Sequence, residues 1–193
     1  MTEPTLMPSI ADAQPQPRRP FHVQTFTALY DAVEDRVRLN AVDKAGVKQS
    51  ILLTRRLLDQ IVPVISKDLE AKTPQGVPAE IVQSMTQERV RQVRREASAS
   101  GNAARPVQRE VQTPEFLCKT VHFKRVPNGL VAVMTDDSTV DAVLPLAEPN
   151  LRTLLDILRA TYAKASWDPR VFPQWLQAEQ RAAVGQGRGI VVN

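Results

Sequence analysis

Residues 37–53, VRLNAVDKAGVKQSILL, decide the fold because they contain two β-strands and the turn that joins them. Residues 36–41 alternate between polar and apolar side chains, which is the period of a half-buried strand. The sequence Asp43-Lys44-Ala45-Gly46 is typical of a tight turn, with glycine where a positive φ is favourable. The residues after the turn return as the paired strand. We therefore predict a β-hairpin with Arg36 and Arg38 on its solvent face.

A helix is predicted directly after this hairpin, over residues 54–69. Thr54 is a suitable N-cap, because its hydroxyl can accept a backbone N–H that the first turn leaves unpaired. Pro63 lies inside the segment and is expected to kink or split the helix, since proline lacks an N–H and clashes with the preceding turn. The apolar residues follow at spacings of one, three and four and form a single face: Leu57, Leu58, Ile61, Val62 and Ile65.

The same order of features recurs later in the chain. Residues 130–134 and 140–146 have the character of strands on either side of Asp136-Asp137-Ser138, and Thr153-Leu154-Leu155-Asp156 matches the start of the first helix. This pseudo-repeat predicts an α+β protein made of two hairpin-plus-helix units. An antiparallel sheet needs its apolar face covered, so we expect the helix of each unit to serve that purpose.

The remaining segments are assigned from local pattern. Residues 21–30 favour a strand over a short helix, and residues 117–126 form a strand that turns at Pro127-Asn128-Gly129. The second helix of the repeat opens at residues 148–150, with Asn150 as its cap. It buries an apolar stripe of Leu151, Leu154, Leu155, Leu158 and Tyr162.

Between the two units we predict a helix over residues 79–97. One side carries the apolar residues Ile81, Val82, Met85, Val90 and Val93. The polar face carries four arginines, Arg89, Arg91, Arg94 and Arg95. Residues 98–114 are small, polar and proline-bearing, which is typical of a linker.

These assignments divide the chain into five parts. Proline-rich residues 1–20 are expected to form a disordered arm, and residues 167–193 an aromatic, proline-bearing tail with a flexible glycine-rich end. Three parts lie between them. The first unit covers residues 21–75, the helix with its linker covers residues 76–115, and the second unit covers residues 116–166.

The composition is that of an ordinary globular chain from a reducing compartment. Hydrophobic residues make up 42% and charged residues 24% of the sequence. The lone Cys118 excludes an intramolecular disulfide framework, and Met1-Thr2-Glu3-Pro4 lacks the features of a secretory signal. Charged residues interrupt every apolar run before it reaches membrane-spanning length. We therefore expect a cytoplasmic location and no membrane contact.

Groups suited to catalysis are scarce, so we do not expect an enzyme. Neither His22 nor His122 stands at a zinc-site spacing, and Cys118 and His122 are too far apart on one strand to hydrogen-bond. Asp136 and Asp137 are explained by the turn preference of aspartate. No phosphate-binding glycine loop is present. The sequence thus predicts no metal, no cofactor and no small-molecule substrate.

The leading functional interpretation is a non-catalytic interaction protein, an adaptor or accessory subunit that contacts a protein partner or a second copy of itself. Tryptophan is enriched among interface anchors, and both tryptophans lie outside the repeated units. The candidate partner-binding residues are Trp167, Phe172, Trp175 and Leu176. The same segment could instead fold back and seal the chain's own core, which we consider the better explanation of these residues.

The alternative interpretation is a nucleic-acid-binding or regulatory protein. The net charge is +4, and residues 76–112 hold six arginines against four glutamates. Arginines on one helix face could contact phosphates and give salt-dependent affinity, although an ordinary solvated helix face explains the same pattern. The candidate phosphate-binding residues are Arg89, Arg91, Arg94, Arg95, Arg36 and Arg38.

Overall fold

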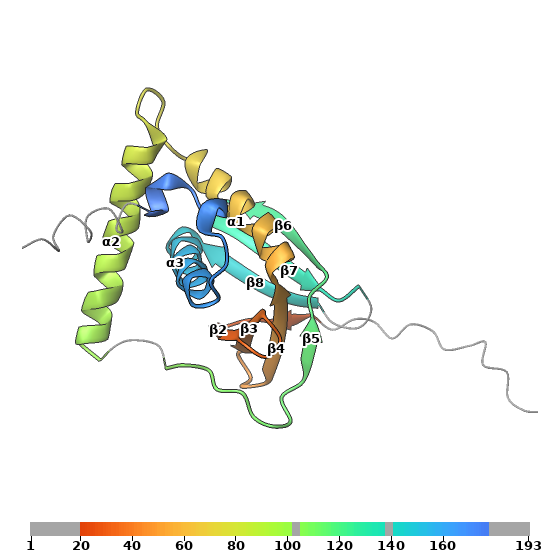
Figure 1. Cartoon of the computed structure of the whole chain (residues 1–193). Helices are drawn as coiled ribbons and strands as arrows, with labels where there is room; N and C mark the ends of the chain where they lie inside the picture. Colours follow the sequence, from red (N-terminus) through yellow and green to blue (C-terminus); the bar gives the residue numbers. More distant parts are fainter. Residues whose placement is uncertain (1–19, 102–104, 138–140, 178–193) are drawn as a thin grey trace, which may run out of the picture.

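The computed structural model describes residues 20–101, 105–137 and 141–177. It contains two four-stranded β-sheets and several helices, which confirms the α+β class (Figure 1). The predicted N-terminal arm and the glycine-rich end lie outside the described residues, apart from Pro20.

Each sheet contains three strands from one unit. The N-terminal sheet has the order β2 (Thr25–Asp31), β3 (Arg36–Val42), β4 (Lys48–Thr54) and β5 (Glu115–Leu117). The C-terminal sheet has the order β1 (Phe21–His22), β8 (Asp141–Ala147), β7 (Gly129–Thr135) and β6 (Thr120–Val126). The helices are α1 (Arg55–Glu70), α2 (Ala79–Ala99), α3 (Glu148–Lys164) and the short 3₁₀ helix η2 (Pro169–Val171).

The fourth strand of each sheet comes from the other unit. Strand β1 runs parallel to β8, with Phe21 opposite Ala142, and β5 runs parallel to β4, with Phe116 opposite Ile51. The two units therefore exchange strands reciprocally. This exchange also corrects two sequence assignments of a single strand, because β1 and β2 both begin within residues 21–30, and Leu117 ends β5 whereas Thr120–Val126 form β6 in the other sheet.

The hairpin turns follow from local chemistry. Asp43 accepts hydrogen bonds from the backbone N–H groups of Ala45 and Val47 through Oδ1, and Gly46 has a φ of +85°. Gly129 begins β7 with a φ of +154°, and a Cβ at this position would lie 2.1 Å from the carbonyl oxygen of Leu146. A side chain there would collide with β8, so only glycine fits.

Both units share one hydrophobic core. Fully buried side chains from the N-terminal sheet, such as Val37 and Ile51, belong to the same cluster as Leu144 and Leu146 from β8. The apolar stripe predicted for α3 is buried as expected. Figure 1 shows α2 at the outer side of the molecule, beside α3.

The predicted helix after the first hairpin is confirmed. Thr54 is its N-cap, and Thr54 Oγ1 accepts a hydrogen bond of 3.2 Å from the N–H of Leu57. The helix continues through Pro63 and is not split. In α3 the predicted cap is wrong, because the helix starts at Glu148 and Asn150 already lies within its first turn.

Helix α2 is present where predicted, but its apolar side does not face the core. Ile81, Met85 and Val93 are 54%, 69% and 58% exposed, whereas the buried residues of the helix are Gln83 and Gln87. The physical reason is hydrogen bonding across the helix interface. Gln83 Nε2 donates to the carbonyl oxygen of Leu69 at the end of α1, and Gln87 Nε2 donates to that of Arg152 on α3.

Candidate functional site

The described residues hold no group of three or more His, Cys, Asp or Glu side chains that could bind a metal ion. Cys118 lies between β5 and β6, so it does not share a strand with His122 as the sequence suggested. Its thiol is buried, donates to the carbonyl oxygen of Thr120, and has its pKa raised to about 11 by that burial. A thiol with so high a pKa is a poor nucleophile at neutral pH.

Over residues 20–101, 105–137 and 141–177, no helix combines the length and the hydropathy that a membrane crossing requires.

The aromatic segment folds back on the chain's own core, as the sequence favoured. Trp167, Phe172, Trp175 and Leu176 are between 0% and 6% exposed. The rings of Trp167 and Phe172 each pack edge-on against Tyr162 at 5.0 Å between centroids. These side chains are inside the molecule, so the interpretation that they form an exposed surface for a partner is corrected.

Arg38 is also buried, at 8% exposure, although the alternation in β3 predicted that it faces solvent. Its guanidinium donates to Asp31 on β2 and to Glu115 on β5. The hydrogen bond from Arg38 lowers the pKa of the Asp31 carboxyl. Arg38 is buried because β5 and the segment before it lie against this face of the sheet, which the sequence did not predict. In that segment the backbone N–H of Val107 donates a hydrogen bond to Thr27 Oγ1.

The Arg36 side chain is partly exposed to solvent, and its guanidinium lies 3.7 Å from the Glu34 carboxylate. It is on β3, whereas Arg91, Arg94 and Arg95 are on α2. The structure therefore does not bring Arg36 and Arg38 together with the arginines of α2.

A hollow of about 500 Å³ lies between α2 and α3, and we call it the arginine hollow. Four arginines and one carboxylate line it, so positive charge predominates among its lining residues, and Glu88 on α2 also pairs with Arg91 and Arg95. Its lining residues are Arg91, Arg94, Arg95, Ser98, Asp156, Arg159 and Ala160.

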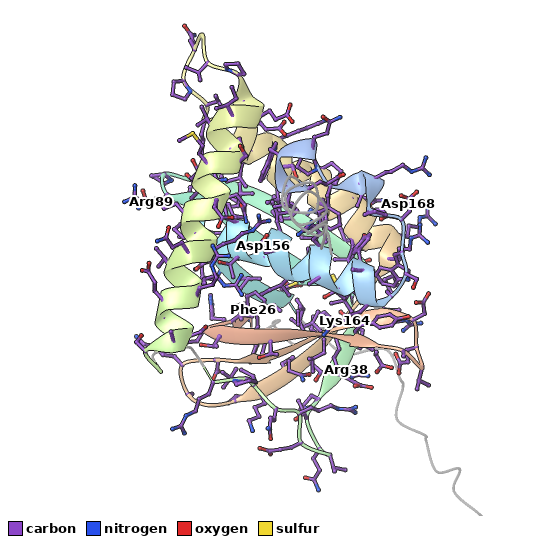
Figure 2. All side chains as sticks on the ribbon, turned by 60° about the vertical axis from the view of Figure 1, so that its left-hand side comes forward. Phe26, Arg38, Arg89, Asp156, Lys164 and Asp168 are labelled. Carbon is purple, nitrogen blue, oxygen red and sulfur yellow. The ribbon has the colours of Figure 1, made fainter. Side chains whose placement is uncertain are left out.

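Asp156 organises the arginines around itself. Arg91 donates to it through Nε at 3.0 Å and through Nη2 at 2.7 Å, and an Nη atom of Arg94 lies 3.9 Å from the second carboxylate oxygen. Figure 2 shows Asp156 on the side of α3 that faces α2. Arg95 pairs instead with Glu88 on the exposed surface of α2.

Arg89 does not belong to this hollow. Its side chain projects from the opposite side of α2, away from α3 (Figure 2). The four arginines that the sequence grouped on α2 are therefore divided by the structure into three at the hollow and one outside it.

Two further hollows adjoin the first along α3. One, of about 560 Å³, shares Arg94 and Ser98 with the arginine hollow and reaches β2; we call it the β2 pocket. The other, of about 380 Å³, shares Asp156 and Arg159 and reaches Trp167. We refer to the three together as the α3 cleft.

Sequence reasoning missed most residues of this cleft, among them Phe26, Arg105 and Arg159. Arg159 had a detectable signal, since it lies three positions after Asp156 on the polar face of a predicted helix. Arg105 lies in the linker and Phe26 on a strand, and no local pattern connects either to α2.

Comparisons with known proteins give no match: no family model, no curated protein and no solved structure matches this chain. A function is therefore inferred from the residues of the chain itself.

Proposed function

We propose that the protein binds nucleic acid along the α3 cleft. The observation that carries the proposal is the arginine hollow, where Arg91, Arg94, Arg95 and Arg159 surround a single carboxylate, that of Asp156. Arginine keeps its charge at every physiological pH and donates in a planar fork that fits phosphate oxygens.

The length of the cleft favours a polymer over a small anion. Its lining residues on α3 extend from Asn150 to Ala163, which corresponds to about 20 Å at a rise of 1.5 Å per residue. A cleft of this length can contact several successive phosphates. Arg105 and Arg94 add positive charge at the end near β2.

The test is a comparison of two matched substitutions on α2. Arg94→Gln removes an arginine from the cleft, and Arg89→Gln removes one that points away from it. Binding of a fluorescein-labelled 12-nucleotide DNA and RNA is measured by anisotropy across a salt series. We expect Arg94→Gln to weaken binding about tenfold, or about 1.4 kcal/mol, and to reduce the slope of log affinity against log salt concentration by about one. The affinity of Arg89→Gln should stay close to that of the wild-type protein.

Circular dichroism must first show that both variants keep the wild-type melting temperature. Equal losses in the two variants would argue for a diffuse charge effect and against a site. Absence of binding by the wild-type protein at about 0.1 M salt would reject the proposal.

A second candidate function is protein–protein association, now through α2 and not through the aromatic segment. Ile81, Met85 and Val93 lie on α2 in one row of residues spaced by multiples of four, with Arg89 at the remaining position of the row, and the three are 54–69% exposed. Rows of this spacing form the ridges by which two helices pack, and a two-fold antiparallel arrangement would place Ile81 against Val93 of a second copy. We therefore propose a homodimer through this ridge.

Sedimentation velocity over a concentration series tests this candidate. A concentration-dependent dimer that Met85→Glu abolishes would support it, with Val33→Glu as a control at an exposed apolar residue in the turn before β3. A protein that stays monomeric at about 0.1 mM would reject the homodimer.

A further inference from the structure

The β2 pocket differs in chemistry from the arginine hollow beside it. Of the residues that line it in the described part of the chain, none is acidic and only Arg94 and Arg105 are charged. The others are apolar or carry neutral hydrogen-bonding groups: Thr25, Phe26, Thr27, Ala28, Ala97, Ser98, Pro106, Asn150, Thr153 and Ile157. Such a lining suits a flat, uncharged, polar-edged group better than it suits a phosphate.

We propose that the β2 pocket receives an unpaired base, so that the ligand of the α3 cleft is single-stranded nucleic acid. This inference rests on the proposed function and adds the class of ligand to it. The phosphates lie in the arginine hollow, and one base enters the pocket next to it.

Phe26 supplies the surface on which the base rests. It is half-buried, packs on the core, and is held by the pairing of β2 with β3, where it lies opposite Ala41. Figure 2 shows Phe26 beneath Asp156, in the space between β2 and α3. An aromatic ring in a fixed position loses little entropy when a base stacks on it, and every base has a π face that can do so.

The neutral polar groups suit the edge of the base. Asn150 is exposed on the first turn of α3, and its amide can both donate and accept. Uncharged bases require such groups, whereas phosphates are best bound by cations.

Arg94 and Ser98 connect the two hollows. They lie four residues apart on α2, hence on the same side of the helix, and line both hollows. A phosphate at Arg94 would therefore have its base beside the pocket. A duplex could fill the pocket only by flipping a base out of its stack, which is unfavourable because base stacking and pairing are lost.

The experiment uses the full chain and three ligands of equal length: a single-stranded 12-mer, the corresponding duplex, and a 12-mer of abasic residues that keeps the phosphates. Phe26→Leu preserves an apolar side chain against the core and removes the ring face. We expect the wild-type protein to bind the single strand at least fivefold more tightly than the duplex or the abasic strand. Phe26→Leu should remove most of that preference and leave the affinity for the abasic strand unchanged.

A second variant, Asn150→Ala, lies on the surface of α3 and protects the test against a folding defect in Phe26→Leu. It should also lower the affinity for the single strand alone. Equal affinity of the wild-type protein for the three ligands, or no change in the preference in both variants, would overturn the base pocket while leaving phosphate binding in place. Failure to bind any of the three ligands would overturn the proposed function as well.

Discussion

Arg91 on α2 and Asp156 on α3 join the two helices through a forked hydrogen bond between residues 65 positions apart in sequence. Both side chains are largely buried, at 11% and 13% exposure. The same guanidinium lies 3.4 Å from the carbonyl oxygen of Leu176 in the returning C-terminal segment. This pair therefore fixes the helix that carries Arg94 and Arg95 against the remainder of the molecule.

Removal of this pair should destabilise the protein measurably. Asp156→Ala leaves the partly buried guanidinium of Arg91 without its carboxylate, and we expect a loss of about 1–3 kcal/mol in the free energy of unfolding by urea. Arg95→Ala breaks the exposed pair with Glu88 and should cost less than about 1 kcal/mol. Equal losses would show that the Arg91–Asp156 pair does not hold the helices together.

Trp175 should be required for stability. It is 4% exposed, its Nε1 donates to Glu70 at 2.8 Å, and its ring lies 5.9 Å from the guanidinium carbon of Arg152. We expect Trp175→Ala to reduce the free energy of unfolding by about 3–5 kcal/mol, measured by urea denaturation. Met85→Ala, at an exposed position of α2, should change it by less than about 0.5 kcal/mol. A stable Trp175→Ala variant would contradict the fold-back arrangement.

The two turn glycines should respond differently to the same substitution. Gly46→Ala places a methyl group in open space and meets only the backbone cost of a positive φ, about 1–2 kcal/mol. Gly129→Ala adds a collision with the carbonyl oxygen of Leu146, so β7 or β8 must shift. The melting temperature of Gly129→Ala should therefore fall well below that of Gly46→Ala. The reverse order would argue against this close contact between β7 and β8.

Cys118 should make stability fall at alkaline pH. Burial raises the pKa of the folded thiol to about 11, so the unfolded chain loses this proton at a lower pH than the folded protein does. The unfolded state thus binds fewer protons between about pH 9 and 11, and the free energy of unfolding decreases as pH rises through that range. Cys118→Ala should show a shallower decrease when unfolding is measured from pH 8 to pH 10.5. Identical slopes for the two proteins would contradict the raised pKa.

Elements with a strong local signal were predictable from the sequence. The turn at Asp43–Gly46, the cap at Thr54 and the apolar stripe of α3 each depend on residues within a few positions of one another. Their physical causes are short-range hydrogen bonds and helical periodicity, which a sequence displays directly.

The errors arose where distant segments meet. The alternation in β3 could not show that β5 brings Glu115 to Arg38, and the apolar residues of α2 gave no sign that Gln83 and Gln87 would face inward. In both cases buried polar groups found partners far away in sequence. The cleft was missed in part for the same reason, because Phe26 and Arg94 come from separate elements.

The reciprocal strand exchange has a consequence for the order in which the chain is synthesised. β4 emerges from the ribosome with one edge unpaired, and that edge stays unpaired until Glu115–Leu117 has been synthesised. β1 remains unpaired even longer, until β8 has been synthesised. An open strand edge is a template for pairing with other chains. Translation of the region between the two units is therefore the period in which this protein is most exposed to misassembly, and only synthesis of the second unit supplies the missing strands of both sheets.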